Sequence, residues 1–354
     1  MTDNRNSNTS DSLPLNEQKL LDRFLNTVTE LSRIDSPTGC EGDFCEKIKR
    51  LTAECDADFY EDKIGNLCFT RKNSDTLFVA HTDEPGFIVT SVNAQGRLKF
   101  EPVGGASAAA LFGKRVKIGQ ALGVVECLPP HLLSGDELKK IPEIKDMCID
   151  IGAKDKSDAL RLTSPGDMGV FYGDLRYYGD RLLCGKGISR LFSCAALITL
   201  MTETDVKGRF LFAVKNYASF AGARAAAFSE GIKRAIVLDC AESFDYLDDR
   251  KDTACKLNGG IVIPFKNGRA MLDREMFNLL SELSEKNGIA YQLQNGEQPP
   301  SCAEAVQTSW GGIKTACLLL PVRNLCSGRE SASYSDALAC IKLLEQYSEL
   351  LNQN

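Results

Sequence analysis

The stretch FVAHTDEPGF, residues 78–87, is the part of the sequence from which the fold is most directly deduced. Its apolar run Phe78–Ala80 has the character of a buried strand, and His81, Asp83 and Glu84 follow it at once. In an open α/β sheet, ligands bind where loops leave the carboxyl ends of the strands. A His-x-Asp sequence at such an end therefore predicts one corner of a metal site. The chain contains only 2 histidines, so further ligands have to be sought among other residue types.

The sequence on either side of this strand predicts an α/β domain. Residues 15–34 carry apolar side chains at helical spacing, and a second helix is expected over 43–55. Beyond Gly185, helical and strand-like segments alternate, which is typical of a mostly parallel sheet with helices on both faces. The predicted strands are 62–70, 76–84, 208–216, 233–243 and 316–322, and the predicted later helices are 189–204, 220–232, 273–289 and 333–351.

A different pattern interrupts this domain directly after the His81 strand. Short alternating runs separated by Gly and Pro, with a turn at 93–96, predict a small β-barrel-like domain that contains one short helix at 154–162. The predicted organisation is a polar, disordered lead-in over 1–14, an α/β domain over 15–86 and 177–354, and an inserted β-domain over 87–176.

Composition excludes several classes of partner. The 354 residues are 43% hydrophobic and 25% charged, with a net charge of -6, and no Lys/Arg block is present to recruit nucleic acid or an anionic membrane. The longest apolar runs, such as 316–320, are too short to span a bilayer, and the N-terminus lacks the apolar core of a secretory signal. The 14 cysteines form no C-x-x-C pair and are expected to be reduced thiols in a cytoplasmic protein.

The order of short motifs along the chain resembles metallopeptidase family forty-two, the glutamyl and tetrahedral-type aminopeptidases, some of which have been labelled endoglucanases. The motifs are SPTGCE (36–41), DKIGNL (62–67), AHTDEPGF (80–87), PPHLLS (129–134) and PVRN (321–324). The resemblance implies an aminopeptidase fold, a co-catalytic pair of divalent metals and the removal of N-terminal residues from peptides. It also implies a homo-oligomer that assembles through the inserted domain.

Three residues match the family's metal site. By this resemblance His81 is a metal ligand, Asp83 orients its imidazole, and Asp239 at the end of AIVLDC is the terminal carboxylate of the same metal. The second histidine, His131, lies in the predicted insert, where the resemblance gives it no ligand role.

Other site positions depart from the family pattern. A bridging carboxylate is needed to offset the repulsion between two adjacent cations, and a titratable side chain is needed to take a proton from water. Here Ser189 stands at the bridging Asp, Asn216 at the general-base Glu, Tyr217 at the second metal's Glu, Cys326 at the last His and Cys302 at a nearby Asp.

Three functional hypotheses follow. The preferred one is an aminopeptidase homologue that has lost dinuclear hydrolysis and acts as a binding or structural subunit, with a peptide as its candidate ligand and no cofactor required. The second is an active metal-dependent aminopeptidase with redrawn ligands, for which Glu242, Asp245 and Glu304 are the carboxylates nearest in sequence. The third is a mononuclear enzyme holding zinc or another divalent metal on His81, Asp239 and Cys326, or a thiol enzyme using Cys240, Cys302 or Cys326.

Overall fold

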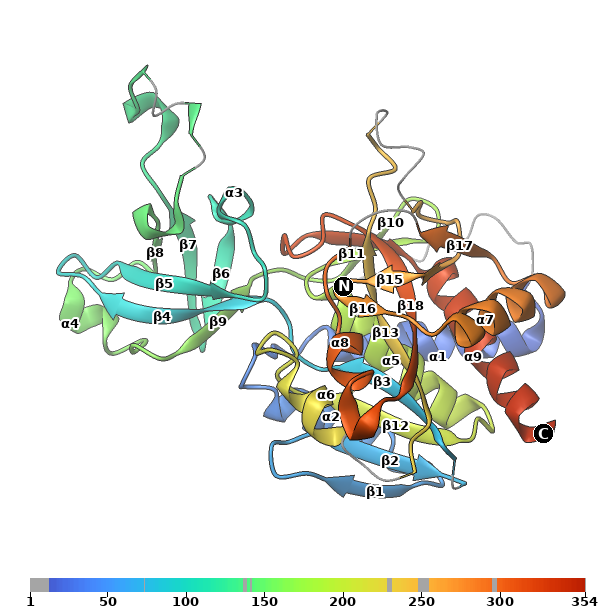
Figure 1. Ribbon diagram of the computed structural model, residues 1–354. Helices are drawn as coiled ribbons and strands as arrows, with labels where there is room; N and C mark the ends of the chain where they lie inside the picture. The colour runs from blue at the N-terminus through green and yellow to red at the C-terminus, as the bar shows by residue number, and fades with distance from the viewer. Residues whose placement is uncertain are drawn as a thin grey trace.

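The computed structural model describes residues 13–72, 74–135, 139–140, 142–227, 231–247, 255–294 and 298–353. An α/β part with an eleven-stranded sheet carries a separate closed barrel of six strands on one side (Figure 1). The α/β fold class with an inserted barrel is thereby confirmed. The predicted lead-in over 1–14 lies almost entirely outside the described residues.

The central strands of the large sheet are parallel, and most of the outer pairs are antiparallel, although β14 and β17 pair in parallel. Strands β12, β3, β13 and β18 run parallel, and all but their end residues are largely buried, as expected for strands covered on both faces. Parallel pairing is thus concentrated in the centre, and the sheet as a whole is mixed. The order is β1 (Asp58–Glu61), β2 (Leu67–Arg71), β12 (Gly208–Ala213), β3 (Thr76–His81), β13 (Arg234–Glu242), β18 (Lys314–Arg323), β19 (Glu330–Ser333), β11 (Leu182–Gly185) and β10 (Arg176–Tyr178), with β14 (Ile261–Pro264) pairing β18 and β17 (Tyr291–Gln294).

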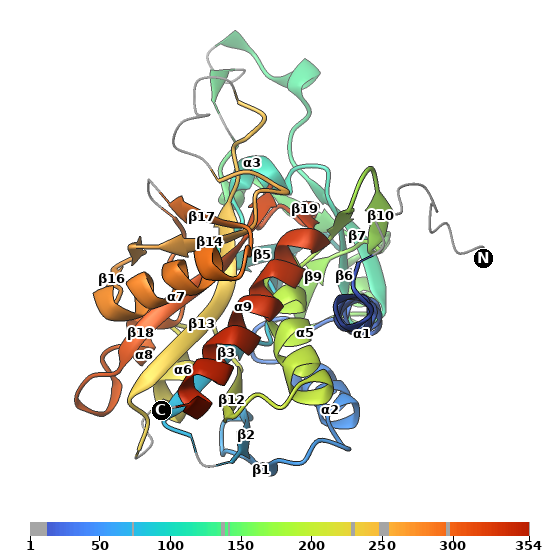
Figure 2. The same ribbon diagram turned by 90° about the vertical axis from the view of Figure 1, so that its right-hand side faces the viewer.

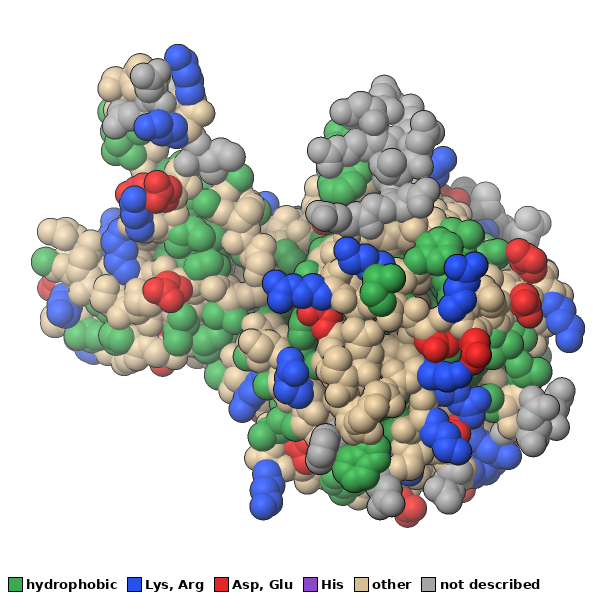
Figure 3. All heavy atoms as spheres, viewed as in Figure 1, with side chains coloured by type: hydrophobic (Ala, Val, Ile, Leu, Met, Phe, Trp, Pro, Cys, Tyr) green, Lys and Arg blue, Asp and Glu red, His purple; other side chains and the backbone are tan. Residues whose placement is uncertain are grey.

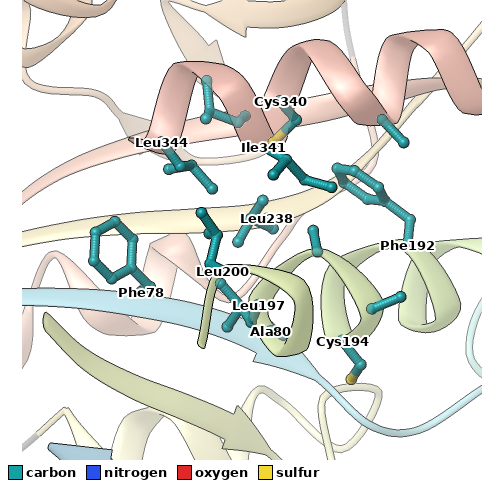
Figure 4. Packing of buried hydrophobic residues seen from close by; sticks show 14 of the residues in the cluster. Phe78, Ala80, Phe192, Cys194, Leu197, Leu200, Leu238, Cys340, Ile341 and Leu344 are labelled. Carbon is teal, nitrogen blue, oxygen red and sulfur yellow. The ribbon is translucent and has the colours of Figure 1, made fainter. Parts of the chain in front are cut away.

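Helices cover both faces of this sheet (Figure 2). One face packs against α1 (Leu15–Leu31), α2 (Gly42–Leu51), α5 (Ile188–Glu203), α7 (Arg274–Lys286) and α9 (Tyr334–Gln353), and the other against α6 (Ala221–Ala226) and α8 (Ala303–Val306). Helix α5 is buried over nearly its whole length, and Leu197 and Leu200 meet strands β3 and β13 below helix α9 (Figure 4). No helix in the described ranges has the length and apolarity needed to cross a membrane.

The barrel has its own apolar core. Its strands are β4 (Gly86–Val92), β5 (Leu98–Val103), β8 (Cys148–Asp150), β7 (Ala121–Glu126), β6 (Arg115–Ile118) and β9 (Met168–Phe171). It also carries the short helices α3 (Ala108–Leu111), α4 (Lys156–Ala159), η1 (Pro130–Leu132) and η3 (Ile144–Asp146). Glycine is required at 169, where an added Cβ would lie 2.2 Å from the Phe87 ring. The barrel strands span 86–171, and the domain division at 87–176 stays a prediction.

Several element boundaries differ from the predictions for local reasons. Residues 62–66 form a turn instead of the start of β2, because the Asp62 carboxylate accepts the backbone N–H of both Ile64 and Asn66. Helix α6 is much shorter than the predicted 220–232 and starts only after Ser219 and Phe220, which both have positive φ. Residues 228–230 of that prediction lie outside the described residues.

Candidate functional site

The sequence-predicted site residues come from neighbouring strand ends and one helix start. His81 ends β3, Asp239 lies near the end of β13, and Asn216 and Tyr217 follow β12, whose Ala213 pairs with His81. Ser189 lies in the first turn of α5. The parallel register brings these segments to one edge of the sheet, as expected for a ligand site in an α/β protein.

A continuous hydrogen-bond chain links His81, Ser189 and Asp239. His81 Nε2 lies 2.8 Å from Ser189 Oγ, and the Ser189 hydroxyl donates to Asp239 Oδ1 at 2.5 Å. On the other side of the ring, His81 Nδ1 lies 3.0 Å from the Asp83 carbonyl oxygen, which can only accept. Nδ1 therefore carries a proton, and Nε2 faces the serine hydroxyl. Both imidazole nitrogens are thus engaged within the protein.

The electrostatic surroundings favour a protonated imidazole. His81 is 2% exposed, and burial lowers its pKa, but Asp83 and Asp239 outweigh that effect and raise the net pKa above its ordinary value. With Nε2 protonated, the chain reads as a donation from His81 to Ser189 and from Ser189 to Asp239. A serine hydroxyl thus connects the His81 ring to a carboxylate whose closest oxygen lies 3.8 Å from Nε2.

Asp83 lies beside His81, but its carboxylate holds the surrounding loops. Asp83 Oδ2 accepts hydrogen bonds from the Thr38 hydroxyl at 2.8 Å and from the Tyr217 backbone N–H at 3.0 Å. Asp83 Oδ1 lies 3.5 Å from His81 Nδ1 and is buried without a hydrogen-bond partner in the described residues. The imidazole is thus oriented by the Asp83 carbonyl together with this nearby charge.

The motifs SPTGCE and DKIGNL position the loop after β12. Asn66 Oδ1 accepts the Val214 N–H at 2.9 Å, and Asn66 Nδ2 donates to the Gly222 carbonyl at 3.0 Å. Glu41 Oε1 accepts the Lys215 N–H at 2.8 Å. These bonds fix the backbone on both sides of Asn216 and Tyr217, which the sequence resemblance predicts to stand at the family's general-base and metal-ligand positions.

Asn216 and Tyr217 provide no ionised group at those positions. Asn216 is 4% exposed, and its Oδ1 is buried with no hydrogen-bond partner among the described residues. The Tyr217 ring packs edge-on against His81 with centroids 5.8 Å apart, and against the barrel at Gly104, where an added Cβ would lie 3.0 Å from the ring. Burial raises the pKa of the Tyr217 phenol well above its ordinary value, so the ring is a neutral wall of the site.

Glu330, which the sequence reasoning missed, organises the far side of the site. Its carboxylate accepts the Ile188 N–H at 2.6 Å and the Cys326 N–H at 2.9 Å, and so joins the start of α5 to the β18–β19 loop. Burial raises the pKa of Glu330 to about 7. The local sequence SGRES reads as a polar loop, so nothing in it indicated a buried carboxylate.

The three candidate thiols are unsuited to nucleophilic chemistry. All 14 cysteines of the chain are free, and Cys240 and Cys302 belong to the apolar cores on the two faces of the sheet. Burial raises the thiol pKa of both well above the ordinary value, and it also raises that of Cys326. Since the thiolate is the reactive form, these groups stay protonated and inert near neutral pH.

The three carboxylates considered as replacement ligands have other partners. Asp245 forms a bidentate pair with Arg323 at 2.6 and 2.8 Å. Glu304 accepts the Arg269 N–H at 2.7 Å, and Glu242 accepts the Leu325 N–H at 3.1 Å. Burial raises the pKa of Glu242 to about 7, which weakens it further as an ionised ligand.

The donor set does not fit a pair of metals. Across the described ranges, no group of three or more His, Cys, Asp or Glu side chains is arranged to hold a metal ion. The two residues predicted as ligands from the sequence resemblance, His81 and Asp239, are linked through the Ser189 hydroxyl. Without a bridging carboxylate, nothing at this place offsets the repulsion of two adjacent cations.

The fold and these strand ends define an aminopeptidase-type α/β protein with an inserted barrel. Comparison with known families gives the particular assignment: the chain belongs to the M42 glutamyl aminopeptidase family, whose model matches residues 65–343. An aminopeptidase homologue from Acetivibrio thermocellus is 31% identical over 312 residues, 87% of this chain and 93% of that protein.

Solved structures agree with this assignment. The TET1 peptidase of Pyrococcus horikoshii superposes with a TM-score of 0.80 at 29% identity, covering 92% of this chain and 99% of that one. An aminopeptidase from the archaeon Desulfurococcus kamchatkensis has the same fold, with a TM-score of 0.86 at 21% identity over 93% of this chain and 95% of that one.

Proposed function

We propose that this chain is a peptide-binding member of the M42 family in which the His81–Ser189–Asp239 hydrogen-bond chain takes the place of a dinuclear metal centre. The observation that carries the proposal is the hydrogen-bond chain itself. It engages Nε2 of His81 and one oxygen of Asp239, the two groups that match family ligands. Under this proposal the protein does not hydrolyse peptides by the family's dinuclear mechanism.

Asn216 supports a binding role for the same site. Its buried Oδ1 has no hydrogen-bond partner in the described residues, and an unpaired buried acceptor is costly. An N-terminal ammonium or a backbone N–H of a peptide would supply the missing donor. An amide accepts such a bond but takes no proton from water, so binding at this position is separated from catalysis.

Assembly into a homo-oligomer is the second part of the proposal. The TET1 peptidase is described as assembling into a tetrahedron or a large octahedral shell. The barrel of this chain exposes hydrophobic side chains on its outer surface (Figure 3), a feature that marks interaction sites. They are Phe112, Leu122, Val124, Leu128 and Leu132, each at least 40% exposed. The cytoplasmic location expected from the cysteines stays a prediction.

The competing proposal is an active aminopeptidase, which the family membership favours. It requires ligands beyond His81 and Asp239. Glu242, Asp245 and Glu304 already accept hydrogen bonds from other groups, which argues against them as the additional ligands. A single metal on His81, Asp239 and Cys326 is the remaining variant of this idea.

The decisive experiment measures turnover, peptide binding and metal content together. Purified protein is assayed with aminoacyl chromogenic substrates in added zinc, cobalt or manganese, and peptide binding is followed by fluorescence anisotropy. We expect saturable peptide binding without turnover. Turnover with two metals per chain would overturn the proposal, as would an absence of peptide binding. One metal that is lost in Cys326→Ala would instead support the mononuclear alternative.

A reconstructed site provides the matched control. The variant Ser189→Asp/Asn216→Glu/Tyr217→Glu/Cys326→His restores every substituted ligand position and the base, and we expect it to gain metal binding. A three-site variant that keeps Ser189 lacks the bridge, so it should bind at most one metal. If both variants bound metal equally, Ser189 would not be the decisive substitution.

A further inference from the structure

A separate cleft lies where helix α1, the barrel and the β9–β10 connection meet. Its volume is about 350 Å³, within the range of small-molecule sites. Its walls come from the carboxyl end of α1, from Lys117 of the barrel strand β6, and from residues 171–177. None of the three residues of the His81–Ser189–Asp239 chain lines it.

Lys186 forms a charged floor in this cleft. Its ammonium group is 6% exposed and donates to Asp35 at 2.5 Å and to Glu84 at 3.0 Å. Both acceptors are shared, since Asp35 also accepts Lys117 at 2.8 Å, and Glu84 also accepts Arg190 at 2.9 Å. Lys117, Lys186 and Arg190 therefore share two carboxylates, which belong to Asp35 and Glu84.

Two arginines add to this excess at the rim. In the part of the chain that the structure describes, Arg33 has no hydrogen-bond or ion-pair partner, although it lines the cleft. Arg176 also lines the cleft, and its guanidinium pairs with the solvent-exposed Asp174 at 3.2 Å. The lining thus carries four cations against the carboxylates Asp35 and Asp174, in a chain whose net charge is -6. Arg33 and Arg176, which supply this excess, are exposed to solvent, and a local excess of positive charge attracts an anion.

The walls of the cleft are aromatic. Tyr172 lines it with Arg115 stacked on its ring at 5.3 Å. Tyr177 is 44% exposed, and its hydroxyl lies 3.0 Å from the Thr29 hydroxyl, which fixes the ring. Fixed aromatic rings beside guanidinium groups suit a ligand that has both a planar ring and a phosphate.

We infer that this cleft binds a small organic phosphate, with the phosphate held by Arg33, Arg176 and Lys117 above the Lys186 floor and the organic group between Tyr172 and Tyr177. Arginine and lysine donate charge-assisted hydrogen bonds to phosphate oxygens, and the arginine fork matches that geometry. The inference is independent of the proposed peptide site, since no group in it takes part in the His81–Ser189–Asp239 chain.

Calorimetric titration of the full chain tests the inference, with AMP, inorganic phosphate and adenosine as probes. We expect AMP to bind saturably, phosphate to bind more weakly and adenosine to bind weakest. In Arg33→Glu/Arg176→Glu the affinity for AMP should fall by about tenfold or more. Both positions are exposed, so the variant is expected to fold, which its thermal unfolding midpoint would confirm.

Arg161→Glu is the matched control. Arg161 is as exposed as Arg176 and has a similar ion pair, with Asp158, but it follows α4 at the end of the barrel away from α1 (Figure 1). Its AMP affinity should stay within about twofold of the wild type. The inference would be overturned if neither AMP nor phosphate bound saturably, or if Arg161→Glu weakened binding as much as the rim variant. Equal affinity for adenosine and AMP would also overturn it, because the phosphate would then contribute nothing.

Discussion

At the scale of single residues, Ser189 determines how His81 and Asp239 interact. A carboxylate at this position would repel Asp239 unless metals lay between them. A hydroxyl is both donor and acceptor, so it bridges the His81 ring and the Asp239 carboxylate directly. A serine at position 189 therefore makes the contact with Asp239 attractive without a cation, whereas a carboxylate there would make it repulsive.

Removing this hydroxyl should destabilise the protein. In Ser189→Ala, Nε2 of His81 and Oδ1 of Asp239 lose their common partner in a buried place, at a cost of about 1–3 kcal/mol in the free energy of unfolding. Chemical denaturation measures this loss. Ser193→Ala is the control, because Ser193 is also buried in α5 but donates to the Arg190 carbonyl at a long 3.4 Å. An equal effect of both variants would show that the hydrogen bonds linking His81, Ser189 and Asp239 contribute no stability of their own.

The sequence revealed some of these residues and concealed others. Ser189 and Asn216 were predicted to be site residues because motifs of the resembled family set the residue expected there, and their assignment as substituted positions stays a prediction. Lys186, Arg190 and Glu330 were missed, because a buried charge is recognised by its partners and those partners come from distant segments.

At the scale of elements, the site depends on how closely helix α6 approaches the end of β12. A Cβ on Gly222 would lie 2.1 Å from the Val214 carbonyl oxygen and 2.6 Å from Asn66 Oδ1. The Val214 carbonyl belongs to the backbone, and the Asn66 side chain holds the loop before Asn216. Neither group can therefore move away from an added Cβ without displacing the site. A glycine here allows the close approach of two elements.

Gly222→Ala should therefore cost about 3 kcal/mol or more in unfolding free energy and weaken peptide binding. Gly42→Ala, at the start of α2, is the control, since an added Cβ there meets no atom within 4 Å. It should be neutral or slightly stabilising, because alanine favours helix. Thermal unfolding compares the two, and similar midpoints would contradict the packing argument.

The start of helix α9 predicts a pH dependence of stability. The Asp336 carboxylate accepts the N–H groups of Asn258 and Gly260, and burial raises its pKa from 3.8 to about 7. Its folded pKa exceeds its unfolded one, so its contribution is fully present below about pH 4 and is lost as pH rises through about 7. Unfolding free energy should fall on the order of 4 kcal/mol over that window, and Asp336→Asn should flatten the slope. An unchanged slope in the variant would contradict this assignment.

Helices and strands were predicted well where the pattern of apolar residues was long, and poorly where it was short. The buried runs of β3, β12, β13 and β18 and the helical periods of α1, α7 and α9 lie close to their predicted ranges. The four-residue strands β11, β14, β17 and β19 carry too few residues for a period, and tertiary pairing alone makes them strands.

At the scale of the whole molecule, the barrel is the expected surface of assembly. Leu122 and Val124 alternate on the outer face of β7, and both are exposed in the single chain. Burying such side chains between copies would remove apolar area from water, which is the main driving force for association.

Light scattering should give a mass that is a multiple of 38.7 kDa. Leu122→Asp/Val124→Asp should shift the protein toward smaller species, because it places charges in the proposed interface. Leu293→Asp, at a similarly exposed leucine of β17 in the α/β part, should leave the mass unchanged. A monomeric wild type would refute the assembly proposal.

The most direct test of the account is whether His81 accepts a metal. Because the chain has only 2 histidines and His131 lies exposed in the barrel's η1 helix, histidine-labelled solid-state NMR resolves the His81 ring nitrogens once His131→Gln assigns the other set. The account predicts that the Nε2 resonance keeps its shift when zinc is added in excess, since Ser189 already occupies that nitrogen. A zinc-induced shift of His81 Nε2, together with two metals per chain, would contradict it.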